Sequence, residues 1–285
     1  MQHNVDYAGE RRKGVVDQPR SVARPSDGKA EAVKQERLAR LTESLKSLSD
    51  GQLKLVESAI AVFGFPHVFR QHSEALLTTE MFADFGDALR LHHAFSAEPF
   101  TKDKFEFLLW KTFVARGVDA ALATKGNPGH DLRIGSDRFS LKTQADKSVK
   151  ADRIWISKFM ELGRGRWQDE RDLAGLRDSF LRHMGQYERI LSLRALHKGP
   201  EWHYELVEIP KGVLQQAQTG QITMQHESRQ TPKPGYCDVR DSSGSLLFRL
   251  YFDGGTERKL QVKDLLKSSC IAHGEWEFTA PQTVV

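Results

Sequence analysis

The chain has 285 residues, 39% of them hydrophobic, and a net charge of +4 from 42 Lys and Arg against 38 Asp and Glu. A chain of this length can bury a hydrophobic core without disulfide or metal cross-links. No uninterrupted apolar run approaches the roughly 20 residues that a membrane span needs. Cys237 and Cys270 are too few and too far apart for a disulfide framework, so the composition argues against a small secreted or membrane protein and points to the cytoplasm.

The first hundred residues are predicted to be largely helical. Residues 1–30 are polar, contain scattered Gly, Pro and Ser, and show no period, so they are predicted to be disordered. Leucines then recur three and four residues apart, which predicts an amphipathic helix over 31–49. Two further helices are expected over 52–63 and 74–95. Residues 31–100 therefore form a predicted helical N-terminal region.

From residue 101 onward the pattern becomes mixed. Thr101 is a plausible N-cap for a helix over 102–116. Residues 130–135 and 138–144 then alternate between apolar and polar around a short turn at Ser136-Asp137, which predicts a β-hairpin. The fold class expected from this change of period is α/β.

The C-terminal half is predicted to begin with a long helix and to end in strands. Apolar residues at three and four spacing favour a helix over 168–197, and a strand follows over 202–209, closed by Pro210. Turn residues at 241–244 and 253–255 indicate β-hairpins in the last fifty residues.

The hairpin at 130–144 places charged groups together. If its loop is centred between Ser136 and Asp137, Leu132 faces Leu141 on an apolar side and Asp131 faces Lys142 on the other side. A carboxylate and an ammonium group would then lie side by side. That arrangement fits either a surface ion pair of little energetic value or a catalytic pair.

The spacing of these residues resembles a known motif. Pro128-Gly-His-Asp131, followed after eight residues by Ser140-Leu-Lys142, resembles the PD-(D/E)xK motif of metal-dependent nucleases. The resemblance implies a mixed β-sheet core flanked by helices, as in restriction endonucleases. It also implies that Asp131 and the backbone carbonyl of Leu141 bind Mg²⁺, and that Lys142 positions or deprotonates the attacking water.

The sequence departs from this motif at position 140, where Ser stands in place of an acid. Some restriction endonucleases share the Ser-x-Lys form and take the missing carboxylate from a neighbouring helix. Glu106, on the helix at 102–116 and beside its apolar stripe, is one donor; Glu161, downstream of the motif, is the other. The sequence leaves open which of the two helps to bind the metal.

Positive charge is concentrated beside the motif. Residues 138–166 contain eight basic and three acidic side chains, a local balance of +5, which is the pattern of a segment that attracts nucleic acid. A solvated lysine-rich loop is the alternative. The residues expected to contact DNA are Gln144, Lys147, Lys150, Arg153 and Lys158.

Residues 100–165 resemble type II restriction endonucleases in particular, and the remainder resembles them only by architecture. The resemblance implies a Mg²⁺-dependent enzyme that cuts double-stranded DNA at a short specific sequence. A homodimer and 5′-phosphate products are expected, with a nuclease core over 101–285 whose C-terminal hairpins contact DNA. The alternatives are a repair or junction nuclease of the same superfamily, or a DNA-binding module with a decayed site.

Overall fold

The computed structural model describes residues 25–124, 126 and 129–280. These residues form two compact units, one ending at Lys54 and one beginning at Leu55. Most of the predicted disordered tail, and Pro128 of the motif, lie outside the described residues. Within the described part of the chain, no helix has the length and apolar character to cross a membrane.

The first unit is helical. Helix α1 spans Pro25–Lys46, and α2, Asp50–Ala61, runs across the boundary between the units. The two helices predicted over 31–49 and 52–63 are therefore confirmed, although α1 begins earlier than expected. Leu38 and Leu41 on α1 are exposed.

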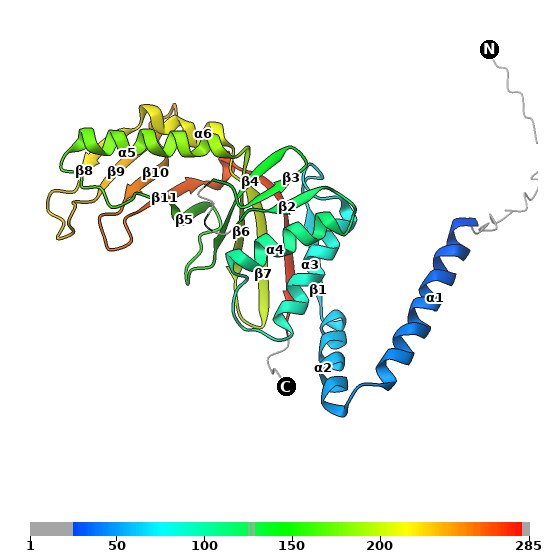
Figure 1. Cartoon of the computed structure of the whole chain (residues 1–285). Coiled ribbons are helices and arrows are strands. Elements are labelled where there is room, and N and C mark those ends of the chain that lie inside the picture. The colour runs from blue at the N-terminus through cyan, green and yellow to red at the C-terminus, as the bar shows by residue number, and fades with distance from the viewer. Residues whose placement is uncertain (1–24, 125, 127–128, 281–285) are drawn as a thin grey trace, which may run out of the picture. The chain divides into compact units, whose positions relative to one another are not determined.

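Most of the second unit is built on two sheets (Figure 1). Sheet A has seven strands, and all neighbouring pairs in it are antiparallel except β4 and β6, which are parallel. Its strands, in spatial order, are β1 (His67–Gln71), β12 (Ile271–Thr279), β7 (Glu201–Glu208), β6 (Arg189–His197), β4 (Asp137–Gln144), β3 (Leu132–Ile134) and β2 (Ala120–Leu122). Helices α3 (Thr79–His93) and α4 (Lys102–Val114) pack against it in one apolar core.

Sheet B has five antiparallel strands. In spatial order these are β5 (Arg153–Glu161), β11 (Lys259–Leu266), β10 (Leu246–Phe252), β9 (Gly235–Arg240) and β8 (Gln221–Met224). Helices α5 (Glu170–His183) and α6 (Lys211–Gln215) cover one face and form a second core with it. The short 3₁₀ helices are η1 (Val62–Gly64), η2 (Met184–Gln186), η3 (Gln216–Thr219) and η4 (Lys267–Ser269).

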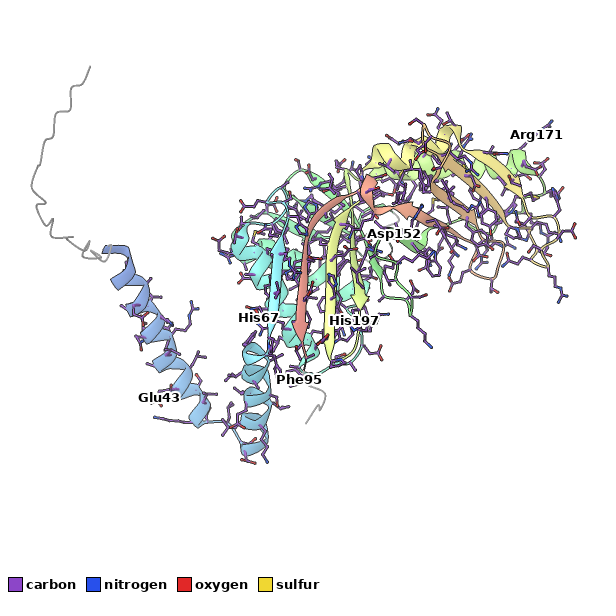
Figure 2. The ribbon with its side chains drawn as sticks, turned by 180° about the vertical axis from the view of Figure 1, so that it is seen from behind. Glu43, His67, Phe95, Asp152, Arg171 and His197 are labelled. Atoms are coloured by element: carbon purple, nitrogen blue, oxygen red, sulfur yellow. The ribbon has the colours of Figure 1, made fainter. Side chains whose placement is uncertain are left out.

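Between the described strands the chain crosses from one sheet to the other four times, and two of these crossings are neighbours. The loop from β4 to β5 leads from sheet A to sheet B, and η4 leads back from β11 to β12. Figure 2 shows this junction from behind, where Asp152 is labelled at the start of β5. Lys267 N–H donates to the Asp152 carbonyl over 2.9 Å, which ties the two crossings together.

The α/β class and the helix-flanked mixed sheet are confirmed, and so are the helix at 102–116, the strand at 202–209 and the C-terminal hairpins. The helical N-terminal region predicted over 31–100 also contains a strand that was not predicted, because residues 67–71 form the edge strand β1. The single helix over 168–197 is also wrong. It ends at His183, and Arg189–His197 forms the strand β6, which pairs with strands on both sides.

The hairpin that carries the motif is confirmed, but its register differs from the prediction. The turn is at Gly135-Ser136, where Gly135 supplies the positive φ of 57° that a two-residue hairpin turn requires. Leu132 therefore pairs with Phe139 rather than Leu141. Because the shift is two residues, each side chain keeps the predicted face, and Leu132, Phe139 and Leu141 are buried together.

Candidate active site

A cleft of about 780 Å³ opens where β4 of sheet A approaches β5 of sheet B. Residues from five segments line it: the start of α4, the loop before β3, β4, β5 and the end of α5. Among them are Asp131, Lys142, Lys158, Glu161 and His183. The fold thus brings residues as far apart in the sequence as Lys102 and His183 around one solvent-accessible space.

Asp131 is held at the entrance to β3 by the backbone. Its N–H donates to the carbonyl of Phe139 over 2.8 Å, and its carboxylate Oδ2 accepts the N–H of Leu141 over 2.6 Å. In an extended strand, the N–H and C=O of one residue point to the same side, so the Leu141 carbonyl is directed to the edge that Asp131 occupies. Asp131 is therefore beside Ser140 and Leu141 rather than opposite Lys142.

Glu106 reaches the same place from α4. The ammonium group of Lys102, one helical turn earlier, lies 2.7 Å from Glu106 Oε1 and 2.7 Å from Asp131 Oδ1. Burial raises the pKa of Glu106, and Lys102 opposes that effect. Burial by itself lowers the pKa of Lys102, but the hydrogen bonds to both carboxylates outweigh it, and the net shift is upward.

This arrangement fits a divalent cation. Two carboxylates converge on one positive charge, and a backbone carbonyl is directed to the same edge, which is the all-oxygen donor set that Mg²⁺ prefers. The ammonium of Lys102 stands in for such an ion. The donor chemistry therefore matches the metal site expected from the motif, with Glu106 as the second carboxylate.

Lys142 lies in the cleft with a perturbed ammonium group. Its Nζ donates to the Phe159 carbonyl over 3.3 Å and lies 5.2 Å from the centre of the Phe159 ring. Burial lowers its pKa from 10.5 to about 8, and Asp131 partly opposes the shift. An amine with this pKa can exchange a proton near neutral pH.

Glu161 lines the cleft but does not touch the two carboxylates. It is the last residue of the strand β5, not a helical residue as the sequence suggested, and its carboxylate pairs with Lys158 at 2.8 Å. Its side chain is 70% exposed, against 21% for Glu106. Of the two candidate acids, Glu106 thus shares a cation with Asp131 and Glu161 does not.

Two residues of the cleft were missed by the sequence reasoning. The sequence held a signal for Lys102, because Glu106 lies four positions later on the same helix and this spacing brings two side chains together. His183 carried no signal, because it lay in a stretch predicted as continuous helix; here it ends α5 and faces the cleft. Burial, and then the charge of Lys142, lower the pKa of His183, while Asp131 opposes the shift, and the net effect favours the neutral imidazole.

The predicted DNA-contacting residues occupy different environments. Lys158 lines the cleft, and Lys147 and Lys150 are exposed on the β4–β5 loop. Arg153 donates through Nη1 to the carbonyls of Leu246 and Asp264, which braces sheet B. Gln144 is buried and lines a second, smaller pocket.

Comparisons with known proteins agree with this geometry. A family model described as SmaI, type II site-specific deoxyribonuclease, matches residues 41–278. The type II restriction enzyme SmaI of Serratia marcescens is 39% identical over 236 residues, which are 82% of this chain and 94% of that relative. No solved structure matches at a significant level. The matched region includes both sheets and every residue of the cleft.

Proposed function

This chain belongs to the SmaI family of type II site-specific deoxyribonucleases, and we propose that it hydrolyses DNA with Mg²⁺ bound by Asp131 and Glu106. The single observation that carries the proposal is the convergence of these two carboxylates on one cation, the Lys102 ammonium. The restriction-enzyme membership itself rests on the family and the relative; the ligand set and the choice of metal are proposed here.

Asp131, Glu106 and the carbonyl of Leu141 would hold the metal. When bound there, Mg²⁺ would polarise the scissile phosphate and lower the pKa of a coordinated water. The Leu141 N–H holds one oxygen of Asp131, and the other contacts the Lys102 ammonium, which also contacts Glu106. Lys102 must move away from both acids when the metal binds.

Lys142 would act on the attacking water. With a pKa of about 8, a fraction of its amine is neutral at pH 7 and able to accept a proton, while the remainder can orient the phosphate as an ammonium group. Attack of water on phosphorus in line with the 3′-oxygen leaves a 5′-phosphate and a 3′-hydroxyl.

DNA would be held by the basic residues beside the cleft. Lys158 reaches the cleft itself, and Lys147 and Lys150 lie on the exposed loop that follows the motif, where each can contact a phosphate. A homodimer is proposed because two active sites are needed to cut two antiparallel strands and a two-fold protein matches a palindromic site.

The test is cleavage of plasmid and phage DNA with and without Mg²⁺. Wild type should give discrete fragments only with the metal, and Asp131→Asn, Glu106→Gln and Lys142→Met should each lower the cleavage rate about 100-fold or more. Glu161→Gln is the matched carboxylate control and should retain most activity. Full activity of Glu106→Gln with loss in Glu161→Gln would overturn the ligand set.

The same assay distinguishes a restriction enzyme from the two alternatives, a junction nuclease and a DNA-binding module with a decayed site. Cutting confined to branched substrates, with intact linear duplex, would indicate a junction nuclease. DNA binding without cleavage under any divalent metal would indicate a decayed site. The family membership favours site-specific cleavage over both outcomes.

A further inference from the structure

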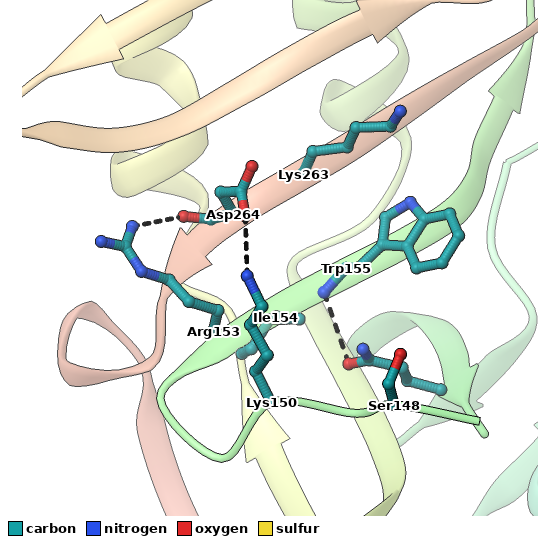
Figure 3. A pocket seen from close by; sticks show the side chains of 8 residues that line it. Ser148, Lys150, Arg153, Ile154, Trp155, Lys263 and Asp264 are labelled. Atoms are coloured by element: carbon teal, nitrogen blue, oxygen red, sulfur yellow. Dashed lines mark hydrogen bonds and ion pairs between the residues drawn. The ribbon is translucent and has the colours of Figure 1, made fainter. Parts of the chain in front are cut away.

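A second pocket, of about 280 Å³, lies where the β4–β5 loop meets sheet B (Figure 3). Gln144 and Trp155 line it, and both belong to the strands that also line the cleft. Gln144 is two residues beyond Lys142 on β4, a separation of about 7 Å along a strand, which equals about two base steps of 3.4 Å along DNA. The pocket is therefore within reach of nucleotides next to the proposed scissile phosphate.

A β-bulge shapes this pocket. In the pairing of β11 with β5, Val262 faces Ile156 and Leu265 faces Ile154, so two residues, Lys263 and Asp264, stand opposite the single residue Trp155. Asp264 has a φ of 52°, in the left-handed region that non-glycine residues rarely adopt. Bulges and such backbone conformations occur where a side chain must be re-aimed, and here both bulge residues line the pocket.

Trp155 is both exposed and fixed in orientation. Its side of β5 is the face opposite the apolar core of sheet B, and the residue is 37% exposed. Its indole Nε1–H donates to Gln261 Oε1 over 3.1 Å, and the buried Gln261 amide donates in turn to Asp253. An aromatic plane held this way is a preorganised stacking surface, because little conformational freedom remains to be lost on binding.

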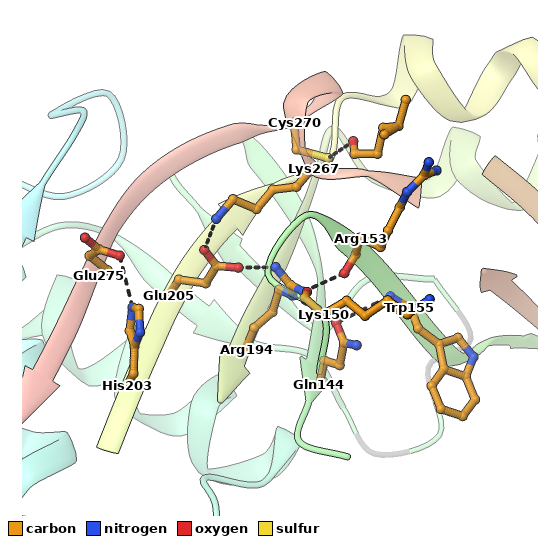
Figure 4. Close-up of polar contacts among 11 residues, drawn as sticks. Gln144, Lys150, Arg153, Trp155, Arg194, His203, Glu205, Lys267, Cys270 and Glu275 are labelled. Atoms are coloured by element: carbon orange, nitrogen blue, oxygen red, sulfur yellow. Dashed lines mark hydrogen bonds and ion pairs between the residues drawn. The ribbon is translucent and has the colours of Figure 1, made fainter. Parts of the chain in front are cut away.

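The amide of Gln144 is oriented from behind by a buried arginine. Gln144 Oε1 accepts Arg194 Nε–H over 2.9 Å and the Trp155 N–H over 3.4 Å, so its NH₂ group is left as the donor on the pocket side. Figure 4 shows this group. Arg194 is fully buried and forms an ion pair with Glu205. It also donates to the carbonyl of Lys150, in the β4–β5 loop, and to the carbonyl of Arg153, the first residue of β5.

The lining combines amide, charged and aromatic groups that can recognise a nucleobase. Three basic residues, Lys150, Arg153 and Lys263, share the pocket with one carboxylate, Asp264, which pairs with Lys150 at 4.0 Å. A base edge offers donors to that carboxylate and acceptors to the Gln144 amide and the Lys263 ammonium. The indole face can stack only on a base whose own face is uncovered. In duplex DNA both faces of a base are covered by its neighbours, so the base must leave the stack.

We propose that this pocket takes one unstacked nucleobase near the scissile phosphate and reads its edge through Asp264 and Gln144, with Trp155 stacked on its face. The position of the bound base relative to the cleaved phosphate rests on the proposed active site, whereas the pocket and its lining do not depend on that proposal. Asp264 and Trp155 are thereby specificity-determining residues of the enzyme.

Base unstacking can be measured directly. Once plasmid digestion has located the cleavage site, duplexes carrying 2-aminopurine at single positions around it are bound to the full-length enzyme with Ca²⁺ replacing Mg²⁺. One position should change its fluorescence on binding by several-fold more than the others, and Trp155→Ala should alter that signal while Trp155→Phe largely preserves it. Uniform signals at every position would overturn the proposal.

Selectivity provides the second readout. Asp264→Gly relieves the positive φ, so the variant should be at least as resistant to thermal unfolding as wild type, yet it should lower discrimination against one altered base pair by about 5- to 150-fold. Phe95→Ala, an exposed aromatic on the loop after α3, is the matched control and should leave discrimination unchanged. Unchanged discrimination in Asp264→Gly and in Trp155→Ala, with normal cleavage by wild type, would refute the nucleobase pocket and leave the proposed metal site intact. Absence of cleavage by wild type would refute the proposed metal site and leave the pocket untouched.

Discussion

A single side chain, Lys102, keeps the two acids of the proposed metal site together. Asp131 and Glu106 are 18% and 21% exposed, and two partly buried carboxylates that close would repel each other without a shared cation. Lys102 supplies that positive charge within the chain. It therefore competes with any metal ion for the same oxygens.

Replacing Lys102 by Gln should strengthen metal binding. The variant removes the competing charge while keeping a side chain of similar length, so the dissociation constant for Mg²⁺ should fall by about tenfold, equivalent to about 1.4 kcal/mol. Isothermal titration with Mg²⁺ checks this directly. Lys104→Gln, exposed on the same helix, should bind Mg²⁺ as wild type does; equal or weaker affinity in Lys102→Gln would contradict the competition.

At the scale of elements, α3 packs closely against sheet A, the sheet whose strand β4 lines the candidate active site. Gly86 of α3 lies directly over Trp276 of β12 and Phe69 of β1. A Cβ at this position would come within 2.6 Å of the Phe69 ring and also meet the Trp276 indole, whose Nε1–H donates to the Phe82 carbonyl over 3.0 Å. The absence of a side chain thus sets the distance between this helix and the sheet.

Gly86→Ala should therefore destabilise the fold despite the better helix propensity of alanine. Overpacking of this kind costs about 1–3 kcal/mol, and chemical denaturation should show a lower midpoint with an unchanged slope. Gly175→Ala on α5, where no atom lies within 4 Å of the added Cβ, is the control and should be neutral or stabilising. Equal stability of Gly86→Ala and wild type would show that α3 can shift without cost.

At the scale of the whole molecule, the basic residues act as one field beside the cleft. The net charge of +4 is small, but the segment 138–166 carries a local balance of +5 and runs from β4 through the β4–β5 loop and β5. That path follows the junction of the two sheets, where the cleft opens. Positive charge is thus placed beside the cleft, where the proposed DNA-binding surface lies.

The salt dependence of DNA binding should report this field. Lys147→Gln, in the exposed loop, should weaken binding equally for all sequences and reduce the slope of log affinity against log salt by about 1. Arg171→Gln, on α5 at the other face of sheet B, should leave the slope unchanged. Titrations of labelled duplex at several salt concentrations provide the measurement, and an unaltered slope for Lys147→Gln would place this loop away from the DNA.

The sequence by itself determined those features that depend only on residues close together in the chain, such as the period of a helix or a strand. Helical spacing identified α4, alternation identified the β3–β4 hairpin, and the motif spacing identified Asp131 and Lys142. A register error of two residues did no harm, because side chains alternate with period two and kept their faces. The helix predicted over 168–197 failed at β6 because this strand is buried on both faces and its apolar residues do not alternate strictly, while Leu191 also fits the helical spacing of the residues before it.

Only the tertiary structure decided which distant groups meet. Helix α4 brings Glu106 and Lys102 to Asp131, while β5 leaves Glu161 with Lys158. The tertiary structure also placed Trp155 opposite the bulge at Lys263 and Asp264, more than a hundred residues later. Sequence patterns record the period of one element, whereas these contacts depend on pairing between strands and on packing of helices against sheets, which no local spacing encodes.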